Sequence, residues 1–403
     1  MNRERKHVCI LAEKFPARSE TFILEHAIGL ARRGYEVTVV SGGPADGISD
    51  SEVKAVSSSG VRMVQHARMR TSGISWIRQI AGVLLRYPVL WRGFRQKRPW
   101  NDHEGITASF KYDALRQLKP DVVHIHFGYH ALSLHRLGAR FPTVVTWHGL
   151  DANVFPRWYG EGMYEALFSG SGYHTVGSDF MAGRLRSLGA RDSSVTKAAM
   201  GVDLTKFPMI DREPSATFRI VSVGRLDEMK GHKYLIDSVS QLMIEGLPVS
   251  LRIVGEGPMR KELERQIEES GQGRQIELLG ARTSAEILDE LRCADLFALT
   301  GVVAASGRVE TQGVAFIEAQ ATGLPVVACD VGGVSESLID GNTGILCKPG
   351  DVASIKGAIK FFWENPEERI AFGLRGRDFV KKRFSIEGML DRFGHLYERI
   401  AGH

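Results

Sequence analysis

Residues 310–327 read ETQGVAFIEAQATGLPVV and form the most informative stretch of this chain. Gly313 stands where a loop would turn into a helix, and the apolar residues after it have helical spacing. We therefore predict a helix over Val314–Thr322 that ends at Gly323. The run Pro325–Cys329 is short and rich in valine, which predicts a buried strand. This order of loop, helix and strand is typical of a parallel α/β sheet.

Two carboxylates, Glu310 and Glu318, stand eight residues apart in this stretch. Glu318 is expected in the first turns of the helix and Glu310 in the preceding loop. A helix N-terminus offers free N–H groups and a partial positive charge, which favour phosphate. Because carboxylates accept hydrogen bonds from sugar hydroxyls, the arrangement suits a ligand with a sugar at each end and phosphate between. The alternative is two solvated glutamates, since this spacing arises roughly once by chance in such a chain.

The composition indicates a two-domain protein. A chain of 403 residues with 43% hydrophobic content can bury substantial cores. Its four cysteines include no CxxC pair and no metal-ligand spacing, so we expect reduced thiols in a cytosolic protein. No signal peptide is expected, and no apolar run approaches the roughly 20 residues that span a bilayer. The cysteines are Cys9, Cys293, Cys329 and Cys347.

The charge is distributed unevenly along the chain. Residues 53–101 hold ten Lys or Arg and no Asp or Glu, and several tryptophans and other aromatic residues lie among them. Basic residues with interfacial aromatics suit an anionic membrane surface, so we expect the stretch to contact one. The alternative is a helical arm with an arginine-rich solvated face. We expect no nucleic acid as a partner, because no nucleic-acid-binding motif accompanies the charge.

Short apolar strands alternate with helical patterns in two series, as in parallel sheets that are covered on both faces. Residues 203–214 are polar, contain two prolines and are expected to link the two series. The first series has strands at 8–12, 36–40, 121–125, 143–147 and 173–176 and a helix at 22–33. The second has strands at 219–223, 250–254, 275–279, 295–299 and 325–329.

The first crossover of the second series brings two cations to the expected strand ends. Arg225 and Lys230 follow the strand 219–223, on the side of the sheet where Glu310 and Glu318 are expected. Open α/β sheets bind ligands at this edge, and two fixed cations can neutralise a diphosphate leaving group. Ordinary surface cations are the alternative. The loop is not a phosphate-binding Walker A loop, because the GK[ST] ending is missing.

Histidines mark the strand ends of the first series. His148 follows the strand 143–147 and precedes a glycine, which favours a place in a cleft over a purely structural role. His124 and His126 alternate on one strand and so face the same side. Because no third ligand stands at metal spacing, we interpret these two as cleft or core histidines.

Taken together, these motifs resemble the retaining glycosyltransferases of the GT-B fold, family 4. The resemblance covers most of the chain, and the order and spacing of the motifs make it specific. The form Ser19-Glu-Thr-Phe22 is most similar to bacterial exopolysaccharide and colanic-acid-type enzymes. The motifs are FPARSETFI at 15–23, HGLD at 148–151, MGVD at 200–203, GR through KG at 224–231, GEGP at 255–258, residues 310–318, GGVSE at 332–336 and DGNTG at 340–344.

The resemblance implies two Rossmann-like domains whose parallel sheets face each other across a cleft. Residues 1–205 would bind the acceptor, with the C-terminal helix at about 386–403 packed back on them. Residues 206–385 would bind the nucleotide-sugar.

The resemblance also implies roles for individual residues. Glu318 would hold the ribose hydroxyls, and Glu310 would lie near the donor sugar. The diphosphate would be bound by Arg225, Lys230 and the N–H groups of Gly313 and Val314. The remaining implied site residues are His148 at the donor sugar, Gly255 on the donor side, and Ser19, Glu20 and Thr21 on the acceptor side.

The implied reaction moves a hexose, with retention, from a UDP-sugar or another nucleotide-diphosphate sugar to a glycan or lipid-linked acceptor. No DxD pair is present to hold a divalent ion, so we expect no metal and no cofactor. The expected place is the inner face of the bacterial cytoplasmic membrane. Thr311 and Gln312 depart from the family pattern, which raises the possibility of an altered donor. The alternatives are a GT-B sugar-nucleotide epimerase, a phosphorylase or a non-catalytic membrane adaptor.

Overall fold

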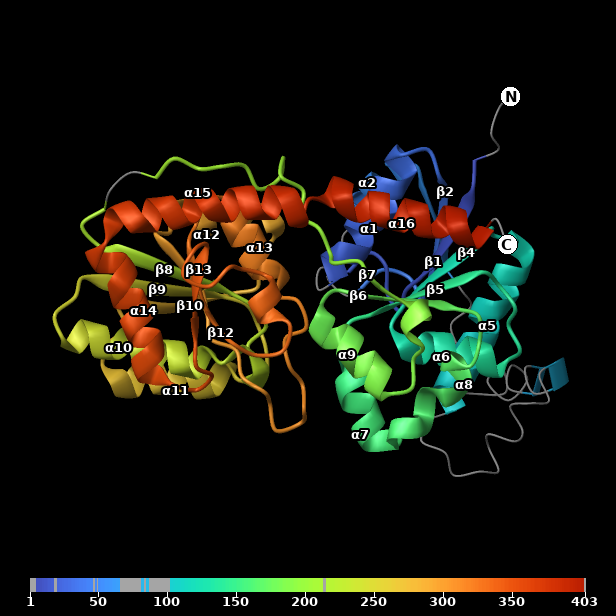
Figure 1. Cartoon of the computed structure of the whole chain (residues 1–403), viewed down its shortest axis with the longest axis horizontal. Coiled ribbons are helices and arrows are strands. Elements are labelled where there is room, and N and C mark those ends of the chain that lie inside the picture. Colours follow the sequence, from blue (N-terminus) through green and yellow to red (C-terminus); the bar gives the residue numbers. More distant parts are fainter. Residues whose placement is uncertain are drawn as a thin grey trace. The chain divides into compact units, whose positions relative to one another are not determined.

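A computed structural model describes residues 5–17, 20–45, 48, 50–65, 81–82, 85–86, 102–212 and 215–401. The chain forms two compact α/β units, each with its own sheet (Figure 1). Unit 1 comprises residues 1–176, 182–198 and 390–403, and unit 2 comprises residues 177–181 and 199–389. Unit 1 therefore takes its residues from both ends of the chain.

Unit 1 contains a seven-stranded sheet in the order β3-β2-β1-β4-β5-β6-β7. All of its paired strands are parallel. The central strands β1 and β4 are almost wholly buried, as expected for a sheet with helices on both faces. The strands are β1 His7–Leu11, β2 Glu36–Ser41, β3 Val61–Gln65, β4 Val122–His126, β5 Thr143–Trp147, β6 Tyr173–Val176 and β7 Val195–Lys197.

Unit 2 contains a six-stranded parallel sheet in the order β10-β9-β8-β11-β12-β13. Successive residues of β8 face opposite layers of the core: Ile220 packs with α10 and α14, and Val221 packs with α13 and α15. The strands are β8 Phe218–Val223, β9 Val249–Val254, β10 Ile276–Gly280, β11 Leu296–Leu299, β12 Val326–Cys329 and β13 Gly344–Cys347.

Helices connect the strands in both units. The last one, α16, places the buried side chains of Phe393 and Tyr397 in unit 1. The longer helices are α1 Thr21–Arg32, α2 Asp50–Ser58, α5 Asp102–Leu118, α6 Gly128–Arg136, α9 Asp179–Ser187, α10 His232–Ile244, α11 Arg260–Ser270, α12 Ser284–Cys293, α13 Val314–Ala321, α14 Val352–Glu364, α15 Pro366–Arg383 and α16 Ile386–Ala401.

The predicted fold class and the predicted series of strands are confirmed, with strand ends shifted by at most one residue. The sequence patterns missed β3, β7 and β13, which are edge strands of the two sheets. In β3 and β7, polar residues interrupt the apolar run. Cys9, Cys329 and Cys347 are buried free thiols as expected, whereas Cys293 is exposed. Within the described part of the chain, no helix is both long and apolar enough to cross a membrane.

Both sheets have a topological switch point, where the strand order reverses direction. In unit 1 it lies between β1 and β4, and in unit 2 between β8 and β11. Ligands of doubly wound sheets bind beyond the carboxyl ends of the strands at such a point. The loops that follow these four strands are therefore where a site is expected.

Candidate functional site

In unit 2, the loops after β8 and β11 are joined by hydrogen bonds. The Thr300 hydroxyl donates to the carbonyl of Gly231 (2.8 Å), and the N–H of Val302 donates to the carbonyl of Met229 (2.9 Å). Gly231 has φ +65°, and a Cβ at this position would lie 1.9 Å from the Thr300 carbonyl oxygen. Only glycine allows this approach, which fixes the Arg225–Lys230 loop against the loop that leads to Glu310.

Lys230 and Glu310 form an ion pair at this point, where the Lys230 ammonium donates to the Glu310 carboxylate. Both side chains are less than one-fifth exposed. Burial alone would raise the pKa of Glu310, but the ammonium of Lys230 and the N–H groups of Thr311 and Gly313 hold it below its usual value. Two residues that the sequence analysis assigned to different parts of a ligand thus touch each other.

Arg225 presents its guanidinium to solvent, with 64% of the side chain exposed. The buried carboxylate of Asp227 lies 4.0 Å from Arg225 but only 3.0 Å from the guanidinium of Arg308. Asp227 therefore pairs mainly with Arg308, and the Arg225 guanidinium remains accessible to an anion.

Gly313 is the N-cap of α13, with φ +78°. It ends the Glu310 loop and starts the helix at Val314, as predicted. The predicted helix end at Thr322 lies one residue beyond the observed end at Ala321. Glu318 lies on the second turn of α13 and is partly buried, so both carboxylates flank the amino end of one helix.

Gln312 and Thr311, which depart from the family pattern, hold the loop in place. The Gln312 amide accepts from the N–H of Met200 and donates to its carbonyl, both at 2.8 Å. The carbonyl of Thr311 accepts from the Ser178 hydroxyl at 2.6 Å. The Gln312 side chain is buried, and its amide forms hydrogen bonds with the backbone of Met200. These hydrogen bonds give a structural reason for a glutamine at this position.

Gly255 contacts the backbone of the Arg225 loop. A Cβ on Gly255 would lie 1.9 Å from the carbonyl oxygen of Gly224. The loop is also paired to this segment by the N–H of Leu226, which donates to the carbonyl of Glu256 (2.9 Å). The glycine therefore supports the loop that carries Arg225.

In unit 1, His148 follows β5 and is held by Asp151. The buried Asp151 carboxylate accepts from the N–H groups of His148, Gly149, Ala152 and Gly128 at 2.8–3.2 Å. Burial raises the pKa of Asp151 to about 6, against the lowering effect of backbone N–H donors. The turn that presents His148 is thus fixed from within.

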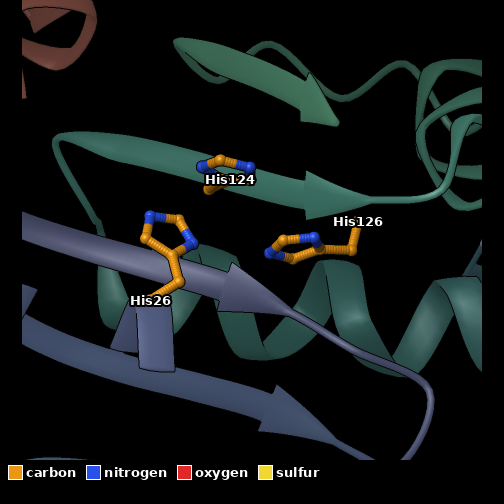
Figure 2. Close-up of side chains that lie close together, drawn as sticks. All are labelled: His26, His124 and His126. Carbon is orange, nitrogen blue, oxygen red and sulfur yellow. The ribbon is translucent and has the colours of Figure 1, made fainter. Parts of the chain in front are cut away.

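Three buried histidines form a cluster in the core of unit 1, next to His148. His124 and His126 of β4 are joined by His26 of α1, and their nitrogens lie within 4.8 Å of one another (Figure 2). His124 and His126 are core histidines, one of the two places that the sequence analysis expected for them. The third histidine, His26, lies about 100 residues away in the sequence, so no local spacing pointed to it. All three are fully buried, and burial lowers their pKa values, that of His26 to about 3.

On the proposed acceptor side, Glu20 precedes α1 and Thr21 is its first residue, whereas Ser19 lies outside the described residues. Burial, followed by the charge of Glu13, raises the pKa of Glu20. Lys111, which was not predicted from the sequence, is 1% exposed, and its ammonium lies 3.3 Å from the Glu13 carboxylate. Its place on the apolar stripe of α5, between buried residues, is the signal that could have found it.

Most of the basic stretch 53–101 also lies outside the described residues. Arg86, which is described, forms an ion pair with Asp113 at 3.2 Å.

Comparison with known proteins identifies two family regions. Residues 19–206 match the family described as Glycosyltransferase Family 4, and residues 206–379 match that described as Glycosyl transferases group 1. The chain is 27% identical to the glycosyltransferase WcaL assigned to colanic acid biosynthesis in Escherichia coli K12, over 92% of this chain and 94% of WcaL. It is 23% identical to the amylovoran biosynthesis glycosyltransferase AmsK of Erwinia amylovora, over 96% and 98%.

Solved structures share the fold. The Anabaena protein Alr3699/HepE, in a crystal structure with UDP-glucose, has a TM-score of 0.72 and 18% identity, over 98% of this chain and all of that one.

Proposed function

This chain belongs to the GT-B glycosyltransferases of family 4 and group 1, and from that premise we propose that it transfers a hexosyl unit from a UDP-sugar, with retention of configuration. The acceptor is a growing glycan or a lipid-linked saccharide of bacterial exopolysaccharide synthesis. The support for this pathway is similarity along nearly the whole chain to the colanic acid and amylovoran enzymes.

The Lys230–Glu310 pair beside the amino end of α13 is the observation that carries the proposal. In the proposed complex, the diphosphate lies against Lys230, Arg225 and the N–H groups of Gly313 and Val314. These groups stabilise the negative charge that develops as the bond to the sugar breaks. Glu318 then accepts hydrogen bonds from the ribose hydroxyls one turn further along α13.

Retention follows, in this proposal, from attack on the face that the diphosphate leaves. Glu310 lies near the sugar and stabilises the positive charge of an oxocarbenium-like transition state. The cations and the helix terminus neutralise the leaving group, so the reaction proceeds without a metal ion. His148, at the carboxyl end of β5 in unit 1, contributes to binding the donor sugar.

The acceptor site is proposed for the switch point of unit 1, around Glu20 and Thr21. We also propose that the enzyme works on the inner face of the cytoplasmic membrane. The support is the acid-free basic and aromatic composition of residues 53–101, which matches an anionic lipid surface.

The test is to incubate the purified protein with UDP-, GDP- and ADP-sugars, with saccharide acceptors and excess EDTA present. We expect release of UDP and a product whose glycosidic bond has the same anomeric configuration as the donor sugar. NMR coupling constants show this configuration. Arg225→Ala should cut transfer about a hundredfold, whereas Arg265→Ala, a similarly exposed arginine on α11, should leave it unchanged. An inverted product, a loss of activity in EDTA that magnesium or manganese restores, or turnover without any acceptor would overturn the proposal.

A further inference from the structure

A chain of buried polar groups runs from His148 into the core of unit 1. Its first link joins Nε2 of His148 to Nδ1 of His126 at 2.9 Å. The planes of the two rings differ by 21°, and their centroids are 5.2 Å apart, so the rings meet edge to edge. Nε2 of His148 thus shares one hydrogen bond with Nδ1 of His126. If His148 donates in this bond, its Nδ1 carries no proton and can only accept; if His126 donates, Nδ1 of a neutral His148 carries the proton and donates.

The next step is a close approach of His126 to His26 without a hydrogen bond in this structure, with nitrogens within 4.8 Å of each other. Nε2 of His126 and Nδ1 of His26 are both buried, and neither has a hydrogen-bond partner among the described residues. Figure 2 shows a nitrogen of the His26 ring directed toward a nitrogen of the His126 ring. Two buried nitrogens that face each other are stable when one carries a proton and the other a lone pair, because two lone pairs or two protons repel.

Tyr397 of α16 continues the chain. Its hydroxyl lies 2.9 Å from Nε2 of His26 and 2.5 Å from Nδ1 of His124. A phenol has one proton, so it donates to one of these histidines and accepts from the other.

The far end fixes the direction. The Thr175 hydroxyl donates to the Val145 carbonyl, which has no proton to give (3.5 Å). Thr175 therefore accepts from Thr146 (2.6 Å), and Thr146 in turn accepts from Nε2 of His124 (2.6 Å). A neutral His124 with its proton on Nε2 has a bare Nδ1, so Tyr397 donates to it.

The positions of the remaining protons follow from this assignment of His124. Since Tyr397 donates to His124, it accepts from Nε2–H of His26, which leaves Nδ1 of His26 bare. A bare Nδ1 favours a proton on the facing Nε2 of His126, whose Nδ1 is then bare. That nitrogen accepts from Nε2–H of His148.

We propose that His126, His26 and Tyr397 are positioning residues that hold His148 in one tautomer, with the proton on Nε2 and none on Nδ1. A bare Nδ1 on His148 accepts a hydrogen bond. That its donor is a sugar hydroxyl rests on the proposed function. Burial keeps the chain neutral, since it lowers the pKa values of His26 and His148 to about 3.

The tautomers can be read directly from side-chain ¹⁵N spectra of histidine-labelled protein, recorded without donor or acceptor. His174 serves as an internal reference, because Trp147 Nε1–H donates to its Nδ1 (3.3 Å) and so places its proton on Nε2. In the wild type, His148, His126 and His26 should all show the Nε2–H pattern of His174. In Tyr397→Phe, His26 loses its acceptor, and His148 should change to a mixture that includes Nδ1–H, while His174 stays unchanged.

A second variant, Thr146→Val, removes the acceptor of His124 at nearly constant volume and should produce the same change. Transfer should fall about tenfold in either variant. An Nδ1–H pattern for His148 in the wild type, or an unchanged His148 in a folded variant, would overturn the proposal. So would a stoichiometric metal ion in the purified protein, because it would occupy the facing nitrogens. The spectra need no substrate, so they test the tautomer independently of the proposed function. If His148 is the Nε2–H tautomer but the protein uses no nucleotide-sugar, only the proposed function is refuted.

Discussion

Lys230 and Glu310 stand 80 residues apart in sequence and meet in a largely buried ion pair in unit 2. The pair joins the loop after β8 to the loop after β11, at the switch point of the sheet. Each charge limits the other: the lysine lowers the pKa of the glutamate, and the glutamate orients the lysine. The diphosphate of the proposed donor would meet a cation already held in place at this point.

Replacing Lys230 with methionine should reduce both activity and stability. Transfer should fall at least a hundredfold, about 3 kcal/mol, because a fixed charge opposite the leaving group is lost. The single variant should also unfold about 3 kcal/mol more easily, since it leaves the charge of Glu310 buried without its cationic partner. Urea unfolding and initial rates measure the two effects. The double variant Lys230→Met with Glu310→Gln should recover the stability but not the activity, and recovered activity would exclude Lys230 from the diphosphate site.

Replacing Gln312 with leucine should destabilise unit 2 by about 2–4 kcal/mol. The backbone N–H and carbonyl of Met200 would remain buried without their partners, and each costs about 1–2 kcal/mol. The measurement is urea unfolding, with Gln241→Leu on the exposed face of α10 as the control. The ratio of rates with different UDP-sugars should not change, because the side chain contacts Met200. A changed donor preference with unchanged stability would show that Gln312 lines the sugar pocket instead.

Unit 1 should lose stability in acid before unit 2 does. In the unfolded chain, histidines titrate near pH 6.5. Burial lowers the folded pKa values of five histidines in unit 1 well below that value, and it also lowers the pKa of His135. As the pH falls below 6.5, the unfolded chain gains protons that the folded unit does not, so stability decreases down to about pH 3–4. The histidines are His26, His124, His126, His148 and His174.

From pH 7 to pH 5.5 the loss is roughly 1 kcal/mol for each of these histidines. Asp151 acts in the opposite direction, since its raised pKa of about 6 adds stability as it gains a proton, but it is a single group. Unit 2 has one comparable histidine, His232, with a pKa lowered to about 4. Hydrogen exchange followed by mass spectrometry can compare the two units, and earlier opening of unit 2 peptides in acid would contradict this prediction.

Charge reversal in the basic stretch should abolish membrane binding. Arg92, Arg95, Lys97 and Arg98 are suitable positions, whereas Arg86 is not, because it is paired with Asp113. Each cation near an anionic surface adds about 1 kcal/mol of attraction, so four reversals to glutamate should eliminate co-sedimentation with vesicles that contain phosphatidylserine.

The matched control reverses four exposed cations of unit 2, which should leave sedimentation intact; these are Lys261, Arg265, Arg274 and Arg282. High salt should weaken the wild-type association, because the attraction is screened. A wild type that does not sediment with these vesicles at low salt would mean that the stretch is a solvated arm.

The sequence was sufficient to predict the two sheets, because buried parallel strands are short, apolar runs rich in β-branched residues that alternate with helical patterns. It was also sufficient to place Arg225, Lys230, Glu310 and Glu318 at one edge of one sheet, since that follows from strand order. It could not show that Lys230 pairs with Glu310, nor that Gln312 binds Met200. Such contacts depend on side-chain directions in loops, which have no periodicity.

Long-range partners account for the other omissions. His26 belongs to a helix whose pattern is ordinary, and only the packing of α1 against β4 shows that it completes a histidine cluster. β7 has three residues, too few for a recognisable alternation.

The assembly of unit 1 from both ends of the chain has a consequence for synthesis on the ribosome. Tyr397, which lies in its core, is translated after all of unit 2, whereas β1 is translated before it. Unit 1 therefore cannot complete its core until unit 2 has been synthesised. While unit 2 is being made, the nascent core of unit 1 stays open along the surface that α16 will cover.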